Sequence, residues 1–389
     1  MASVRKRLDG RPKPWLVRWR DEAGSERKKS FARKVDADKF RADVEHKLNT
    51  GNYIDPKAGK VTFQSYAERW RVMQPHRENT AARIKSQLHK HVYPAFGARP
   101  MAGVTASTLQ AFVTALPLAP SSVRPVFGTV RAIFAAAVRD RVIGRDPTPG
   151  IKLPELPRDE IVPLTLSQVD ELAAVMPPRY RAVVEFDAGT GLRQGELFGV
   201  EVDDLDLDER MLTVARQVQP TAGGGVVVCA LKNKHSYRKV PLAQAMVDVA
   251  RAHLAEYPPQ EVEVLDTTGR KPVTRMARFL FLDGAGRPLS RTRFNAEVWA
   301  PARAAAGLPE STNHDLRHFY ASALIRAGLN PKVVAARLGH ADASMTLRVY
   351  AHLWPDDEDR SRQAVDDLFS ARCAPPVPQL REVIGVAAA

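Results

Sequence analysis

The sequence predicts a multidomain, mainly α-helical protein with small β elements. The chain has 389 residues, which is more than one ordinary domain needs. Apolar residues recur every three or four positions over much of its length, as they do on one face of a helix. Prolines between residues 146 and 157 predict a linker that divides the chain, because proline removes backbone donors and fixes φ.

The composition favours an acidic partner. The net charge is +14, and the first 60 residues hold 17 Lys/Arg against 9 Asp/Glu. A basic leading segment indicates nucleic acid, although a generally charged surface is the alternative. Cys229 and Cys373 form neither a C-x-x-C pair nor a disulfide framework, which is typical of a reducing compartment. No apolar run reaches the roughly 18 residues of a membrane span and no signal-peptide pattern is present, so we expect a cytoplasmic protein.

Residues 1–55 are expected to form a small α+β unit. Strand-like segments at 15–20 and 27–34 flank a turn, and apolar residues from Ala37 to Leu48 predict a helix that Gly51 closes. The helix should pack on one face of the sheet. The opposite face and its loops should carry seven cations, which would either enter a DNA groove or remain a solvated surface: Arg5, Lys6, Arg7, Arg18, Arg20, Lys28 and Lys29.

Residues 61–148 predict a bundle of four helices. The apolar patterns lie at 63–70, 84–92, 109–116 and 123–138. The second helix should end near Pro94, because proline disrupts the helical hydrogen-bond ladder.

A third region, residues 162–365, opens with a capping-box pattern at Thr165 and Gln168. It should be mostly helical, with a small β-sheet. Strand-like segments lie near 212–214, 226–228 and 239–240, around a glycine turn. Residues 366–389 form a proline-containing tail, for which docking on a neighbouring protomer is one hypothesis.

Arg193 is a candidate phosphate ligand. A phosphodiester resists attack because its charge repels nucleophiles, and arginine neutralises it bidentately while staying charged. Gly191 and Gly195 flank Arg193 and should let the backbone approach DNA closely. Glu196 should orient Arg193 or cap the following helix.

Arg317 is the second candidate and lies three residues after His314, on the same helix face. His314 can hydrogen-bond a phosphate or exchange a proton with a nucleophile, because an ordinary histidine titrates near neutral pH. His318 would complete an H-x-x-x-H metal pair. The zincin glutamate is missing, however, so His318 is better explained as a supporting or packing residue.

Tyr350 is the candidate nucleophile, since a phenolate can attack phosphorus and hold the strand covalently. Gly339 should end the preceding helix in a left-handed conformation and turn His340 sideways. A lysine in the predicted hairpin tip at 231–242 should protonate the leaving 5′ oxygen. Lys232 is the first choice and Lys234 the second.

These strings together resemble the tyrosine site-specific recombinases, or phage-type integrases. The matching strings are TGLRQGEL at Thr190–Leu197, HDLRH at His314–His318, LGH at Leu338–His340 and the downstream Tyr350. The likeness in layout extends over most of the chain. Residues 1–55 resemble an arm-type DNA-binding domain, 61–148 a helical core-binding domain and 162–365 the catalytic domain.

The resemblance implies that the phenol attacks the scissile phosphate, forming a 3′-phosphotyrosine and freeing a 5′ hydroxyl that attacks the partner strand. The family's catalytic roles would fall to Arg193, Lys232, His314, Arg317, His340 and Tyr350. No metal, nucleotide or other cofactor is implied, because the ester conserves the bond energy. Four protomers would assemble on double-stranded DNA attachment sites to integrate, and also excise, a phage or an integrative plasmid. A DNA-bending host factor and a directionality factor are candidate accessory partners.

Three other functions are alternatives. A type IB topoisomerase-like enzyme would use similar chemistry without strand exchange. A DNA-binding regulator would keep the scaffold without needing a tyrosine at position 350. A metal-dependent nuclease would need a carboxylate cluster that the sequence does not offer.

Overall fold

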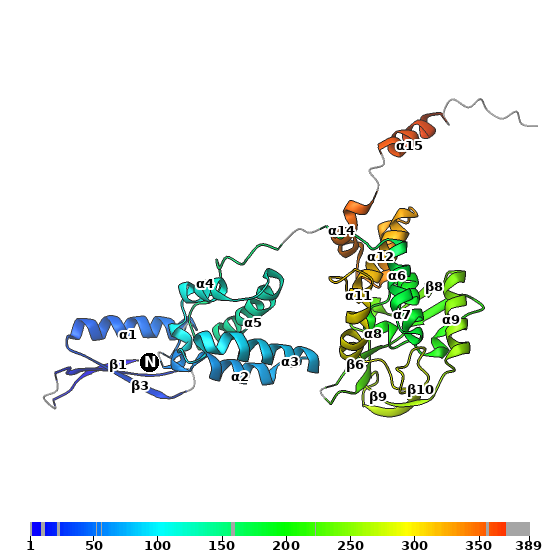
Figure 1. Cartoon of the computed structure of the whole chain (residues 1–389). Coiled ribbons are helices and arrows are strands. Elements are labelled where there is room, and N and C mark those ends of the chain that lie inside the picture. Colours follow the sequence, from blue (N-terminus) through cyan, green and yellow to red (C-terminus); the bar gives the residue numbers. More distant parts are fainter. Residues whose placement is uncertain are drawn as a thin grey trace, which may run out of the picture. The chain divides into compact units, whose positions relative to one another are not determined.

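The computed structural model describes residues 2–8, 12–21, 24–51, 53–55, 57–156, 160–221, 223–354 and 358–370. The chain divides into two compact units, residues 1–158 and 159–389. Both are rich in helices, and small antiparallel or mixed sheets complete them (Figure 1). The predicted fold class, mainly α with small β elements, is confirmed. The predicted tail, residues 366–389, does not begin at a helix boundary, because residues 366–370 belong to helix α15, Glu358–Ser370; the rest of it lies outside the described residues.

A three-stranded antiparallel sheet opens the first unit. Its strands, in the order β1-β2-β3, are β1 Ser3–Lys6, β2 Trp15–Arg20 and β3 Glu26–Phe31. Helix α1, Lys34–Asn49, lies along one face (Figure 1) and ends at Thr50, before Gly51 at a φ of +67°. Val17 and Trp19 of β2 pack against this helix in a core that contains Ala37 and Val44. The predicted strands and helix are therefore present, and β1 is an additional strand.

The register of this sheet divides the predicted cations between its two faces. Arg18 pairs with Lys28, whereas Val17 pairs with Lys29, and neighbouring residues of a strand point to opposite faces. Exposed cations on the face away from α1 are Arg5, Arg18, Arg20 and Lys28. Lys29 instead lies over the ring of Phe40 from α1 at 4.4 Å, and Lys6 lies over Trp15 at 5.8 Å. The prediction that put Lys6 and Lys29 on the open face is wrong, because the two-residue period places them on the helix side.

The rest of the first unit is a helical bundle with its own apolar core. Four of its helices are α2 Phe63–Met73, α3 Glu78–Gln87, α4 Ala106–Ala115 and α5 Pro120–Arg139. Shorter helical turns are η1 Ala58–Lys60 and η3 Met101–Gly103. The second helix ends close to Pro94, as predicted, because the backbone leaves helical geometry at Phe96, two residues after the proline. The chain continues from α3 into a π-type helix, η2 Leu88–Gly97, that accommodates the proline.

The second unit is mostly helical. Its helices before the last strand are α6 Leu166–Val175, α7 Pro178–Thr190, α8 Gln194–Leu197, η4 Val202–Asp204, η5 Lys234–Ser236 and α9 Gln244–Glu256. After it follow α10 Arg291–Phe294, η6 Asn295–Trp299, α11 Ala300–Ala305, α12 Asn313–Arg326, α13 Pro331–Leu338, α14 Ala343–Tyr350, η7 Ala351–Leu353 and α15 Glu358–Ser370. The predicted capping box is formed, because Thr165 and Gln168 bond each other's backbone N–H at the start of α6. No helix in the described part of the chain is both long and apolar enough to cross a membrane.

Two small sheets lie in this unit. One has the order β10-β9-β7-β6, with β6 Gln217–Pro220, β7 Val226–Cys229, β9 Val262–Asp266 and β10 Val273–Ala277. The other has the order β4-β5-β8, with β4 Leu205–Asp206, β5 Met211–Val214 and β8 Arg238–Pro241. Strands β7 and β8 therefore belong to different sheets. The segment with Lys232 and Lys234 is a connection between two sheets and not the predicted hairpin tip.

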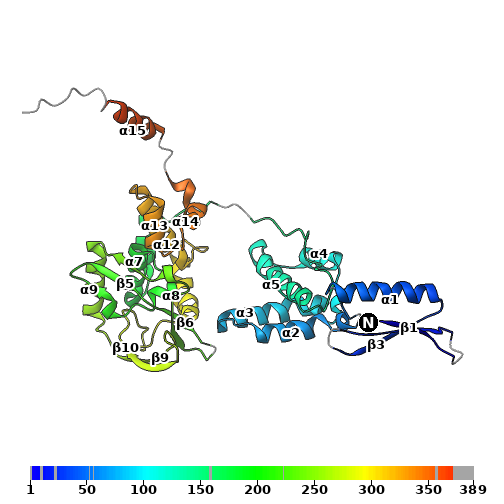
Figure 2. The same ribbon diagram turned by 180° about the vertical axis from the view of Figure 1, so that it is seen from behind.

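Gly191 lets helices α7 and α12 approach closely. It ends α7 at a φ of +60°, and a Cβ there would lie 2.3 Å from the ring of Tyr320 in α12. A Cβ on Gly195 would lie 3.1 Å from the carbonyl oxygen of Val218. The sequence predicted that these glycines admit DNA, but the structure gives both a different reason: protein neighbours occupy the space of the missing side chain. Helices α12, α13 and α14 follow one another in the same part of the unit (Figure 2).

Candidate active site

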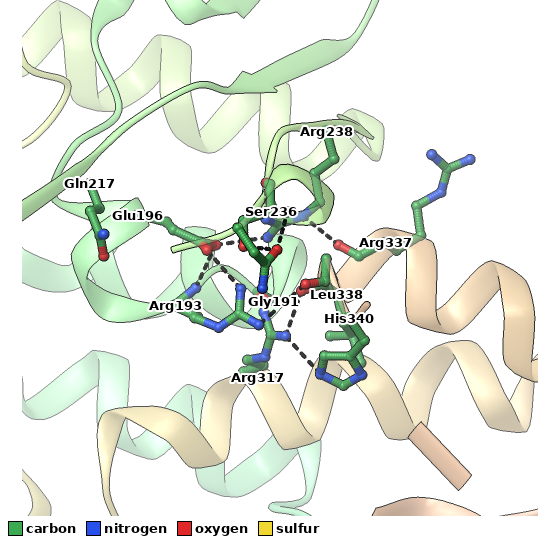
Figure 3. Close-up of polar contacts among 12 residues, drawn as sticks. Gly191, Arg193, Glu196, Gln217, Ser236, Arg238, Arg317, Arg337, Leu338 and His340 are labelled. Carbon is green, nitrogen blue, oxygen red and sulfur yellow. Dashed lines mark hydrogen bonds and ion pairs between the residues drawn. The ribbon is translucent and has the colours of Figure 1, made fainter. Parts of the chain in front are cut away.

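Arg317 lies at the centre of the candidate site. Asp315 accepts hydrogen bonds from the backbone N–H and hydroxyl of Thr312 and so fixes the start of α12. One turn further on, the Arg317 side chain is only 1% exposed. Its guanidinium donates to the carbonyl oxygens of Gly191 at 2.7 Å and Leu338 at 2.5 Å (Figure 3). The helix thus holds a cation between two backbone turns that lie almost 150 residues apart in the sequence.

Arg193 approaches the same place from α8. Its guanidinium donates to the Glu196 carboxylate at 2.8 Å (Figure 3) and to the carbonyl oxygen of Gly339 at 3.3 Å. The backbone N–H of Arg193 also donates to Glu196, at 3.2 Å. Both roles that the sequence predicted for Glu196, orientation and capping, are therefore confirmed. The Arg193 side chain remains 37% exposed, so this guanidinium can also meet a ligand from solvent.

His340 meets Arg317 through the turn that ends α13. Gly339 adopts a φ of +66°, as predicted, and the chain turns so that His340 Nε2 lies 3.1 Å from an Arg317 nitrogen. Arginine has only donors, so Nε2 must accept and Nδ1 carries the proton. Nδ1 then donates to the buried Thr346 hydroxyl at 2.8 Å. Burial, followed by the positive field of Arg317, lowers the pKa of His340 to about 4 and keeps it neutral near pH 7.

Tyr350 closes α14 and is only 2% exposed. Its hydroxyl lies 2.7 Å from Nδ1 of His318, and the two rings meet edge to face at 5.5 Å between centroids. Burial raises the pKa of Tyr350 to about 12, while Arg317 opposes that shift. Burial also lowers the pKa of His318 to about 4, with His314 adding to the effect. The neutral phenol therefore faces a neutral imidazole.

His314 lies at the exposed rim of the cluster. Its ring meets that of His318 at 4.7 Å, edge to face. Partial desolvation by the surrounding protein, and then Arg317, lower its pKa. The sequence treated His314 as the histidine able to exchange a proton with the nucleophile. The histidine that touches the phenol is His318, which the sequence assigned to a supporting role.

Arg238 is a site residue that sequence reasoning missed. Its guanidinium pairs with Glu196 at 2.9 Å and donates to the carbonyl oxygens of Ser236 at 2.9 Å and Arg337 at 2.7 Å (Figure 3). It also lies against Gly339, where a Cβ would be 2.9 Å from one of its nitrogens. Arg238 thus ties the lysine-bearing connection to the turn that presents His340. The signal that could have found it is its position two residues before the buried Val240 in β8, because alternate residues of a strand lie on the same face.

Two buried acids near the arginines, Glu196 and Asp187, have pKa values shifted in opposite directions. Burial raises the pKa of Glu196, but Arg238 and Arg193 outweigh it, so the net pKa is lowered and the carboxylate stays ionised. Asp187 is fully buried, and neither carboxyl oxygen meets a hydrogen-bond partner among the described residues. Burial raises its pKa well above the ordinary range, and Arg317 opposes that shift. Burial, then Arg193 and Arg238, lower the pKa of Arg317 to about 9, and it remains charged at neutral pH.

Lys232 and Lys234 both lie exposed on the connection between β7 and β8. Within the described part of the chain, neither takes part in the hydrogen bonds of the arginine cluster. Asn233, between them, accepts from Ser236 and fixes the short helix η5. The structure therefore brings Arg193, Arg317, His340 and Tyr350 into one cluster of side chains, with His314 at its rim. The two lysines lie on a neighbouring exposed segment.

The site combines arginines that can bind phosphate, histidines that can exchange protons and a tyrosine that can act as a nucleophile. This combination is typical of an enzyme that acts on phosphodiesters. Residues 163–356 match the model of the phage integrase family, and the chain belongs to this family of tyrosine recombinases. It is 24% identical to the integrase of Mycobacterium phage FRAT1 over 343 residues, which cover 85% of this chain and 97% of that relative.

Solved structures share the fold. The integrase of transposon Tn1549, in complex with transposon right end DNA, matches with a TM-score of 0.67 at 21% identity, over 79% of this chain and 100% of that one. A lambda integrase tetramer bound to a Holliday junction matches with a TM-score of 0.53 at 17% identity, over 91% and 95% of the two chains. The protein is a tyrosine recombinase, an enzyme of DNA cleavage and rejoining that serves site-specific integration of a mobile element.

Proposed function

We propose that Tyr350 is the nucleophile of this recombinase and that Arg193 and Arg317 hold the scissile phosphate. One observation carries the proposal: Arg193 and Arg317 converge on the Leu338–Gly339 turn, and His340 continues from it. Charge that develops on phosphate oxygens is best stabilised by donors already fixed in place. Backbone carbonyls and Glu196 fix these guanidinium groups before any DNA is bound.

The reaction is a pair of transesterifications. The phenol oxygen attacks phosphorus, a 3′-phosphotyrosine forms and the 5′ oxygen leaves. The freed 5′ hydroxyl of a partner strand then reverses the step and rejoins the DNA. His340 would hold a phosphate oxygen together with Arg317, and His314 would contact the phosphate from the rim. Because Tyr350 is only 2% exposed, its surroundings have to open a path from the phenol oxygen to the phosphate when DNA binds.

Lys232 is the proposed acid for the leaving 5′ oxygen, with Lys234 as the alternative. Both are exposed and flank Asn233, so the connection can present either to DNA. A substrate with a 5′-bridging sulfur decides between them, since a thiolate leaves without protonation. The variant that has lost the acid should regain cleavage on the sulfur substrate, whereas the other lysine variant should behave like the parent on both substrates.

The sheet of the first unit is the proposed arm-type DNA contact, and residues 61–148 the core-binding domain. The face with Arg5, Arg18, Arg20 and Lys28 gathers four exposed cations in adjacent strands. A three-stranded sheet of this kind fits a major groove.

We place the protein in the cytoplasm and at the nucleoid when DNA is bound. Four copies would act on a pair of double-stranded attachment sites, with a bending protein and a directionality factor as candidate partners.

A nicked suicide substrate tests the proposal, because the cleaved strand diffuses away and the covalent complex accumulates. The parent protein should give an adduct that survives denaturation and is unaffected by EDTA. Tyr350→Phe should bind the same DNA without forming an adduct. Strand cleavage by Tyr350→Phe would refute the assignment, and a parent protein without any adduct would favour a DNA-binding regulator.

A further inference from the structure

His318 touches the reacting atom of the proposed nucleophile. Its Nδ1 lies 2.7 Å from the Tyr350 hydroxyl, a normal length for a hydrogen bond between an oxygen donor and an imidazole nitrogen. The two side chains come from different helices, α12 and α14, so the contact is made by tertiary packing. A general base has to lie within this reach of the proton that it removes.

Its surroundings keep the imidazole able to accept. The charged or titratable groups that act on it are His314, Asp315 and Arg317 of its own helix, and Tyr350 faces it from α14. Burial, then His314, lower the pKa of His318, so the unprotonated ring predominates at neutral pH. His314 meets His318 ring to ring, and within the part of the chain that the structure describes no hydrogen bond joins it to the phenol.

We infer that His318 is the proton acceptor for Tyr350 in DNA cleavage, a catalytic role that rests on the proposed function of this site. As the phenol O–H bond breaks, its proton passes to Nδ1 of His318 and the phenol oxygen bonds to phosphorus. The bond from phosphorus to the 5′ oxygen breaks, and that oxygen takes a proton from the lysine acid. The step leaves an imidazolium and a neutral lysine, and rejoining returns both protons.

The test measures single-turnover adduct formation on the nicked substrate between pH 5.5 and 9. His318→Asn keeps a hydrogen-bonding group close to the position of Nδ1 but cannot accept the proton near neutral pH. It should react roughly 10²-fold or more slowly than the parent at pH 7. Its rate should rise about tenfold for each pH unit, because only the rare phenolate would attack, whereas the parent should be nearly flat over this range.

Two further variants separate chemistry from structure. His318→Ala should be rescued by added imidazole, and a role in packing alone predicts no rescue. His352→Gln removes an exposed histidine close to Tyr350 in sequence, one that contacts the carbonyl oxygen of Ile161, and should leave rate and pH profile unchanged. The loss in His318→Asn should persist on the 5′-bridging sulfur substrate, which suppresses only the loss of the acid.

The outcomes are distinct. Parent-like rate and pH profile in His318→Asn would overturn the inference while leaving Tyr350 in place. Faster cleavage would also overturn it, and would make the contact a latch that restrains the phenol. Adduct formation by Tyr350→Phe would instead overturn the proposed function itself.

Discussion

The sheet of the first unit and the arginine cluster of the second unit both present cations, but in opposite ways. Arg18 and Lys28 lie exposed, side by side on an open sheet face. Arg317 is buried, and backbone carbonyls hold its guanidinium from two sides. The first arrangement suits attraction of a polyanion, which depends on the number of charges and is weakened by salt. The second suits a reaction, because the donors are already in position when charge develops.

The largest expected effect is on stability, where removal of the buried Arg238 should cost much more than removal of an exposed arginine. It pairs with Glu196 in a buried setting, and its removal leaves Glu196 short of a partner. We expect Arg238→Ala to lower the free energy of unfolding by roughly 3–5 kcal/mol. Arg251→Ala is the matched control, since Arg251 pairs with the exposed Asp208 and should cost about 1 kcal/mol or less. Urea unfolding measures both, and equal losses would contradict the distinction.

Arg317→Ala should affect catalysis more than DNA binding. We expect cleavage of the nicked substrate to slow by roughly 10²–10³-fold or more, as when one preorganised transition-state donor is removed. Affinity for DNA should change far less, because the exposed cations supply most of it. A loss in cleavage rate below tenfold would place Arg317 outside the reacting centre.

Acid should destabilise the arginine cluster. Burial holds the folded pKa of His318 and His340 at about 4, below the ordinary value of about 6.5. Between these values the unfolded chain binds more protons, so stability is fully present above about pH 6.5 and falls as the pH approaches 4. Calorimetry at pH 7.5 and pH 5 should show a transition lowered by several degrees, and His318→Asn should reduce this sensitivity. An unchanged transition would contradict the burial of neutral histidines.

The smallest expected effect is on DNA binding by the open sheet face, and variants of Lys28 and Lys29 can measure it. They are neighbours in β3, but Lys28 lies on the open face and Lys29 lies over Phe40. Lys28→Ala should weaken binding to arm-site DNA and reduce the slope of log affinity against log salt by about 0.9 for one lost phosphate contact. Lys29→Ala is its matched control and should keep the slope. Equal slopes in both variants would make the open face an ordinary solvated surface.

Much of the architecture could be predicted because it is local. The helix from Lys34, the capping box at Thr165 and the left-handed Gly339 all follow from spacing or from conformational preference. The end of a helix near Pro94 was predicted as well, but the π-type form of the segment that contains this proline was not. The separation of β7 from β8 depends on strand partners that lie far away in the sequence.

The candidate residues for the reaction could be chosen from their sequence motifs. The catalytic role given to each of them remains a prediction. Their contacts could not be derived from spacing. In the sequence, Arg238 resembles any other cation of a strand. Only its burial against Glu196 in the folded protein distinguishes it from a surface arginine. His318 reads as the packing neighbour of Arg317, and only the return of α14 to α12 brings the phenol to its ring.

By itself the sequence determined the family, the helical character of the chain and the set of candidate arginines, histidines and tyrosine. These features depend on residue type and on short-range periodicity. The tertiary structure alone decided which imidazole meets the phenol, which cations are buried and which face of the first sheet carries charge. The physical reason is that desolvation and hydrogen bonding depend on neighbours in space, and the neighbours that matter here are up to about 150 residues apart in the chain.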